Sequence, residues 1–78
     1  MPQDANDDRP KPRLIPGKGA SHMAGVSLAT WGRLRAADKT PSPVRLGGRV
    51  LWRVEELESW IAAGCPDGKT WRARRGAD

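Results

Sequence analysis

Tryptophan supplies every large aromatic side chain in this chain of 78 residues, which has four tryptophans and no phenylalanine or tyrosine. The core of so short a chain has to be filled by large apolar side chains, so the tryptophans decide which segments can meet there. We therefore expect Trp31, Trp52 and Trp60 to lie in the core. Trp71 stands in a basic segment near the end, where docking on the core and remaining loose are both open.

The length allows at most one domain, and the two ends lack the composition of a core. Residues 1–13 contain three prolines, many charges and only two apolar residues, so we expect a disordered N-terminal tail. Residues 65–78 are similar apart from their tryptophan, and we expect a basic C-terminal tail there. The domain is then residues 14–64, a size at which a single core is marginal but possible.

Cysteine use and hydropathy indicate a soluble protein of a reducing compartment, the cytoplasm. Cys65 is the single cysteine, so no disulfide can form within the chain. No apolar run approaches the length of a membrane span, and the N-terminus has no apolar signal-peptide region. Neither His22 nor Cys65 has a second ligand at the spacing of a zinc site, so we expect no metal and no cofactor.

Charge is distributed unevenly along the chain. Residues 27–53 hold six basic residues and one acidic residue, a net charge of +5, whereas residues 54–63 hold three glutamates and no basic residue. A basic surface of this density is typical of a protein that binds a polyanion. A merely solvated basic surface is the alternative interpretation.

Three segments have helical signals, at residues 18–24, 28–37 and 54–63. Gly25 can end the first helix in the left-handed conformation, and Ser27 is a good N-cap for the second. Only three residues separate these two helices, which is the spacing of a helix-turn-helix unit. The third helix has an apolar stripe formed by Val54, Leu57, Trp60 and Ile61.

The segment PVRLGGRVLW, residues 43–52, alternates as a half-buried strand does, and its glycine pair indicates a hairpin turn. A turn of Gly47 and Gly48 alone would place Arg49 among the apolar side chains of one face. A loop of residues 47–49 leaves that face entirely apolar, so we predict this loop, with Arg49 at its tip. In this register Leu46 pairs with Val50 and Val44 pairs with Trp52, while Arg45, Leu51 and Arg53 occupy the other face.

The predicted order of helix, tight turn, helix, hairpin and helix is an α+β fold, a small winged helix-turn-helix. In such a fold the second helix enters the major groove of DNA, and the hairpin lies beside it as a wing. The second helix and the hairpin are both basic, while the third helix is acidic and is expected to face away. Arg33 could then reach a base edge, and Arg49 a phosphate or the minor groove. Arg35 is expected to add long-range attraction.

Two segments resemble the excisionase-like, or AlpA-type, winged helix-turn-helix proteins, which are relatives of MerR DNA-binding domains. AGVSLATWGRL, residues 24–34, is similar to the family pattern LGVSxxTxxRL. PVRLGGRVLWRVEELESWI, residues 43–61, is similar to PxxRxGGRxxxxxxxLExWL. The chain has Gly32 where the family often has a large aromatic residue, and Leu28 where it often has a basic one.

The resemblance implies binding of double-stranded DNA, as a transcription regulator or as a recombination directionality factor of a mobile element. By position, it implies contacts from Thr30 and Arg33 on the second helix and from Arg45 and Arg49 in the wing. With their neighbours, the predicted DNA-binding residues are Ser27, Ala29, Thr30, Arg33, Arg35, Arg45, Gly47, Gly48 and Arg49.

Other functions remain as alternatives. No carboxylate pair, Cys-His pair or phosphate-binding loop is present, so an enzyme is not expected. An adaptor that binds a recombinase or polymerase through the acidic last helix and the basic tails stays open. RNA, or bases stacked on tryptophan, are weaker alternatives. About fifty residues offer few base contacts, so cooperative self-association on DNA, or binding beside a site-specific recombinase at the nucleoid, is open as well.

Overall fold

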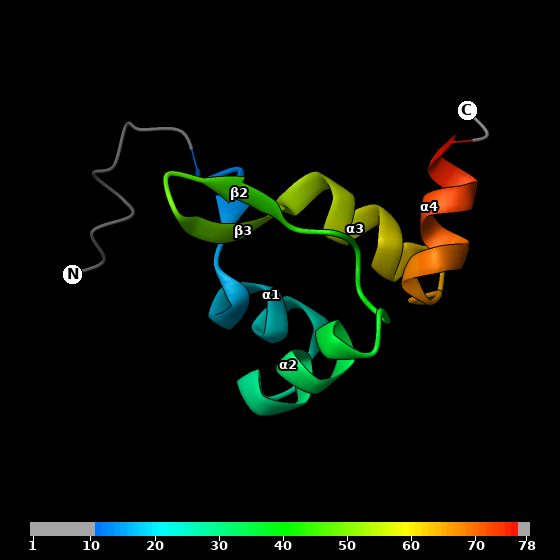
Figure 1. The fold of residues 1–78 in the computed structure, drawn as a ribbon, viewed down its shortest axis with the longest axis horizontal. Helices are drawn as coiled ribbons and strands as arrows, with labels where there is room; N and C mark the ends of the chain where they lie inside the picture. The colour runs from blue at the N-terminus through cyan, green and yellow to red at the C-terminus, as the bar shows by residue number, and fades with distance from the viewer. Residues whose placement is uncertain (1–10, 77–78) are drawn as a thin grey trace.

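The computed structural model describes residues 11–76 (Figure 1). This part of the chain is an α+β arrangement of four helices and a three-stranded antiparallel sheet, compatible with the predicted winged helix-turn-helix. The elements in chain order are β1 (Leu14–Ile15), α1 (Gly17–Ala24), α2 (Leu28–Ala36), β2 (Val44–Leu46), β3 (Arg49–Arg53), α3 (Val54–Ala62) and α4 (Gly68–Gly76).

The first two helices begin and end where their capping residues predict, within a residue. Gly25 follows α1 in the left-handed conformation, with φ of 77° and its amide bonded to carbonyls of the last turn. Ser27 caps α2, because its Oγ accepts a hydrogen bond of 3.0 Å from the Thr30 amide. A cap of this kind satisfies one of the amides that a helix start leaves unpaired. The helix-turn-helix unit is therefore confirmed.

The sheet has the order β1-β3-β2, so β3 is its central strand. The edge strand β1 was not expected from the sequence, and it pairs Leu14 with Arg53 and Ile15 with Trp52. The amide of Val54 also bonds the carbonyl of Arg13 at 2.9 Å. The end of the segment predicted as an N-terminal tail is thus tied to the sheet, while residues 1–10 lie outside the described residues.

The hairpin has a two-residue turn, so the predicted three-residue loop is wrong. Gly47 and Gly48 form the turn, with φ of 58° and 83°. Positive φ at both central residues defines the type I′ turn, whose twist matches that of the flanking strands. Glycine adopts both values freely, and this turn chemistry overrides the preference for one apolar face. The observed pairs are Leu46 with Arg49, Arg45 with Val50, and Val44 with Leu51.

Both faces of this hairpin consequently carry apolar side chains. Trp52 is 3% exposed and belongs to the core, and the half-buried Val50 packs against the core. Leu51 points to the opposite face by strand alternation, yet it is only 8% exposed. Leu46 shares that outer face and is 57% exposed. Leu51 lies on the face opposite Trp52, as predicted, but it is buried there and not exposed. Val44, Leu46 and Arg45 were assigned to the wrong faces.

The core is built on tryptophan, as the composition requires. Trp31 is at its centre, with edge-to-face contacts to Trp52 at 5.5 Å and to Trp60 at 5.9 Å between ring centroids. Perpendicular packing of this kind aligns the positive edge of one ring with the negative face of another. Ala20, Leu57 and Trp71 complete the buried cluster.

The indole N–H groups have different partners. Trp52 Nε1 donates to the Pro41 carbonyl at 2.9 Å, and Trp60 Nε1 donates to the Pro66 carbonyl at 2.8 Å. Trp71 Nε1 donates to a carboxylate oxygen of α3 at 2.8 Å. Trp31 Nε1 is buried and has no hydrogen-bond partner among the described residues. The Trp31 indole therefore contributes packing alone.

The segment after Gly64 corrects the prediction of a basic tail. It forms α4, and Trp71 on this helix is only 7% exposed within the core cluster. The start of α4 is attached to Asp38, whose carbonyl accepts the Gly68 amide at 2.7 Å and whose carboxylate pairs with Arg72 through two hydrogen bonds of 2.9 Å. A Cβ on residue 68 would lie 2.8 Å from the carbonyl oxygen of Asp38, so glycine permits this close approach.

Two carboxylates at the start of α4 are held in their charged form. The hydrogen bonds from Arg72, with its charge, lower the pKa of Asp38. A hydrogen bond of 2.7 Å from the Thr70 amide, an N-cap interaction, lowers the pKa of Asp67. Each pKa is lowered in the folded state, so each carboxylate stabilises the fold above its ordinary pKa, and this contribution is lost as the pH falls through the folded value.

We therefore expect α4 to loosen as the pH falls below about 4, the ordinary pKa of aspartate. The backbone amide resonances of residues 71–74, followed in an acid titration, measure this loosening, whereas the indole N–H of Trp71 also responds to the Glu56 carboxylate that it bonds. In the double variant Asp38→Asn/Asp67→Asn the same amide resonances should be perturbed at neutral pH and titrate less. Unchanged amide resonances of α4 throughout the titration of the unaltered protein would contradict the expectation.

Within residues 11–76, no helix has the length and apolar character needed to cross a membrane.

Candidate nucleic-acid interface

The first turns of α2 carry a chain of polar side chains. Ser27 Oγ donates to Thr30 Oγ1 at 3.0 Å, and Arg33 Nη2 donates to the same Thr30 oxygen at 3.1 Å. The spacing of three residues places the three side chains on adjacent turns of one helix surface. One bond uses only one of the five N–H groups of the Arg33 guanidinium. Arg33 is therefore positioned by Thr30 and retains donors for a ligand.

The outward face of α2 is otherwise made of small residues. Trp31 points into the core, whereas Ala29, Gly32 and Ala36 are exposed with Arg33. A Cβ on Gly32 would meet no atom within 4 Å, so packing within the fold does not require glycine there. The backbone of this helix is consequently open to close approach from outside. The predicted contact residues Ala29, Thr30 and Arg33 lie on this helix as expected.

Arg35 has a structural partner that the sequence analysis did not identify. Its guanidinium carbon lies 5.7 Å from the centroid of the Trp52 ring. A cation over an indole face is attracted by the ring electrons, at about 0.5–1 kcal/mol in exposed positions. The contact joins α2 to β3, beside the contact between Trp31 and Trp52. Arg35 therefore helps to hold the hairpin against α2.

The predicted hairpin residues are all exposed, but the true register separates the two arginines. Arg49 is the first residue of β3, opposite Leu46, and the tip consists of the two glycines. Arg45 pairs with Val50 and so shares the face that carries Trp52. Arg45 is thus on the side of the sheet against which α2 packs, and Arg49 is on the other. The prediction of Arg49 at the tip is wrong by one position.

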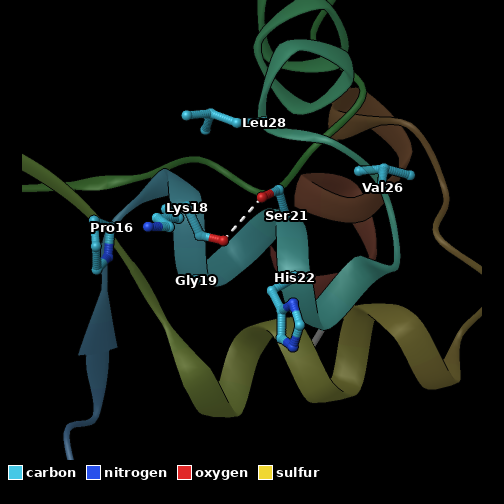
Figure 2. A pocket seen from close by; sticks show the side chains of 7 residues that line it. All are labelled: Pro16, Lys18, Gly19, Ser21, His22, Val26 and Leu28. Atoms are coloured by element: carbon cyan, nitrogen blue, oxygen red, sulfur yellow. Dashed lines mark hydrogen bonds between the residues drawn. The ribbon is translucent and has the colours of Figure 1, made fainter.

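An open groove of about 700 Å³ lies along α1 and the first turn of α2. Figure 2 shows Leu28 projecting from α2 above Lys18, with His22 and Val26 farther along. Leu28 is 55% exposed. The Ser21 hydroxyl donates to the Lys18 carbonyl at 2.8 Å and so is used within α1.

The structure also shows basic side chains that the predicted site omitted. Helix α4 contains four basic residues and no acidic one, and Lys69 and Arg74 are exposed on it. The composition of residues 65–78 signalled this charge, but the helix itself was not predicted. On α3, by contrast, Glu55 and Glu58 are exposed. Among the described residues, no three His, Cys, Asp or Glu side chains are grouped as a metal site would need.

Comparison of the chain with models of protein families, with curated proteins and with solved structures gives no match.

Proposed function

We propose that this protein binds double-stranded DNA as a small winged helix-turn-helix protein, with α2 in the major groove and the hairpin beside it. The observation that carries the proposal is the exposed face of α2, where Arg33 is held by Thr30 among small residues. The resemblance to excisionase-like and AlpA-type proteins supports the same function. Recombination directionality and transcription regulation are the two roles it suggests.

The dimensions and chemistry of the major groove suit this helix face. The groove is about 12 Å wide and admits an α-helix. Small side chains at Ala29 and Gly32 would let the helix backbone come near the base edges. Arginine can donate two hydrogen bonds to O6 and N7 of guanine, the commonest specific contact in such complexes. Arg33 is the residue we propose for base recognition.

The hairpin is proposed to contact the DNA backbone. Arg45 and Arg49 are exposed next to a glycine turn, and neither forms an ion pair with another described residue. Phosphate contacts position a protein on the duplex and carry little sequence information. Gly47 and Gly48 are exposed and have no side chains, so the turn could approach a phosphate closely. A site-specific recombinase and further copies of the chain are proposed partners on the same DNA.

Binding measurements with alanine variants test these roles. Arg33→Ala should cost about 1–3 kcal/mol on the preferred duplex and relax discrimination at one base position. Arg45→Ala and Arg49→Ala should weaken specific and scrambled duplexes alike, each lowering the salt slope by about one unit. The reason is that phosphates repeat identically along the duplex, whereas base edges do not. Titrations with both duplexes at several salt concentrations measure these effects.

Two results would count against the proposal. If Arg33→Ala weakened both duplexes equally, α2 would not read the sequence. If no duplex bound the unaltered protein, DNA binding would be rejected, and an adaptor that uses the exposed glutamates of α3 would become the better interpretation. Circular dichroism of each variant controls for loss of folding.

A further inference from the structure

We propose that α4 is a second DNA-contacting element, whose exposed basic side chains contact the phosphate backbone next to the segment bound by α2. This inference rests on the proposed function and extends the interface to a helix outside the helix-turn-helix and the wing. The proposed partner of α4 is the DNA backbone and not an acidic protein.

Helix α4 is strongly basic. Residues 68–76 hold four basic residues and no acidic one, whereas α2 holds two basic residues. The most basic helix of the described structure is therefore not the proposed recognition helix. Arg72 is paired with Asp38, but Lys69 and Arg74 are exposed and have no ion-pair partner among the described residues. They are available to a polyanion.

The rest of the fold holds α4 firmly in place. A nine-residue segment of this composition would be a marginal helix on its own. In the protein, Trp71 anchors it in the core, and its indole donates to Glu56. The Gly68 amide and the Arg72 guanidinium both bond to Asp38. These contacts hold the basic residues in a defined orientation, which lowers the entropy cost of binding them to a ligand.

Helix α4 is attached to the fold next to one end of α2. Asp38 lies two residues beyond the end of α2, so α4 begins beside the C-terminal end of the proposed recognition helix (Figure 1). Lys39 follows at the same junction and is exposed. A duplex bound along α2 would therefore continue toward Lys39 and Lys69. An acidic protein would explain the charge of α4 but not its attachment to α2, so we favour the DNA backbone.

The test compares two double variants that each remove two positive charges. In Lys69→Gln/Arg74→Gln both changes are on α4, and in the control Lys11→Gln/Arg13→Gln both are exposed residues before β1. The probes are a duplex selected by the protein from a randomised pool and a scrambled duplex of equal length. We expect the α4 variant to lower the salt slope by about 1–2 units on both duplexes, because each lost phosphate contact removes about 0.9. The control should change it by much less.

Each outcome is decisive. Equal effects of the two double variants would mean that net charge alone acts, and they would overturn the inference. An unchanged slope in the α4 variant, with Arg33→Ala still reducing specific binding, would overturn the role of α4 and leave the proposed function standing. If the unaltered protein binds neither duplex, both proposals fail. Glutamine is compatible with a helix, and circular dichroism verifies that α4 remains folded.

Discussion

Trp52→Ala is expected to lower the free energy of unfolding by about 3–5 kcal/mol, a large part of the stability of so small a domain. Trp52 is 3% exposed and packs edge-to-face with Trp31. Truncation would leave a cavity in the core and remove the hydrogen bond that Trp52 Nε1 donates to the Pro41 carbonyl. A domain of this size has a total stability of only about 3–10 kcal/mol. Urea denaturation followed by circular dichroism measures the loss.

The matched control is Leu46→Ala in the same hairpin. Leu46 is 57% exposed, so its truncation should change the free energy of unfolding by about 0.5 kcal/mol or less. Leu51→Ala should fall between the two, since Leu51 is 8% exposed but lies outside the tryptophan cluster. Equal destabilisation by Leu46→Ala and Trp52→Ala would contradict the observed register.

Trp71→Ala is the second substitution for which we expect a large loss, about 3 kcal/mol. The reason is that α4 belongs to the core: Trp71 is 7% exposed and its indole bonds Glu56. For a domain of this size, such a loss lowers the melting temperature by more than about 10 °C. A thermal melt by circular dichroism is the measurement.

Arg74→Ala is the control on the same helix. Arg74 is exposed, so its truncation should leave the melting temperature nearly unchanged. A melting temperature for Trp71→Ala equal to that of the unaltered protein would show that residues 65–78 behave as a tail after all.

The helices of the helix-turn-helix and α3 could be predicted from sequence because their signals are local. Ser27 and Gly25 are capping residues whose chemistry acts within one turn, and the stripe of α3 repeats at the helical period. The other two elements depend on contacts between distant segments. Strand β1 has only two residues, and α4 has a single large apolar residue, Trp71. Strand β1 is too short to show a period, and α4 has too few apolar residues to show one.

The hairpin register was predicted incorrectly because two rules disagreed. The rule of one apolar face favoured a loop that included Arg49, and the turn chemistry of Gly47 and Gly48 favoured two residues. The strand pairs show that turn chemistry prevailed, since the outer face tolerates Leu46 in solvent and still buries Leu51. In a hairpin this short, turn geometry sets the register more strongly than burial does.

The candidate site was predictable residue by residue but not in its arrangement. The sequence identifies Arg33, Arg45 and Arg49 as exposed basic residues on the expected elements. It does not show that Thr30 holds Arg33, because that bond depends on side-chain rotamers. It also assigns Arg45 and Arg49 to relative positions that depend on the register, and an error of one residue there changes the face on which a side chain lies.

The four indole N–H groups can serve as intrinsic NMR probes of different parts of the fold. The N–H resonance of Trp52 reports on the loop before the hairpin, and that of Trp60 reports on the turn after α3. The N–H resonance of Trp71 reports on the contact between α4 and α3. The N–H of Trp31 bonds no described group, and its resonance reports on the centre of the core. One proton spectrum with four indole signals can therefore show which part of the molecule a variant or a ligand has altered, without any label at a chosen position.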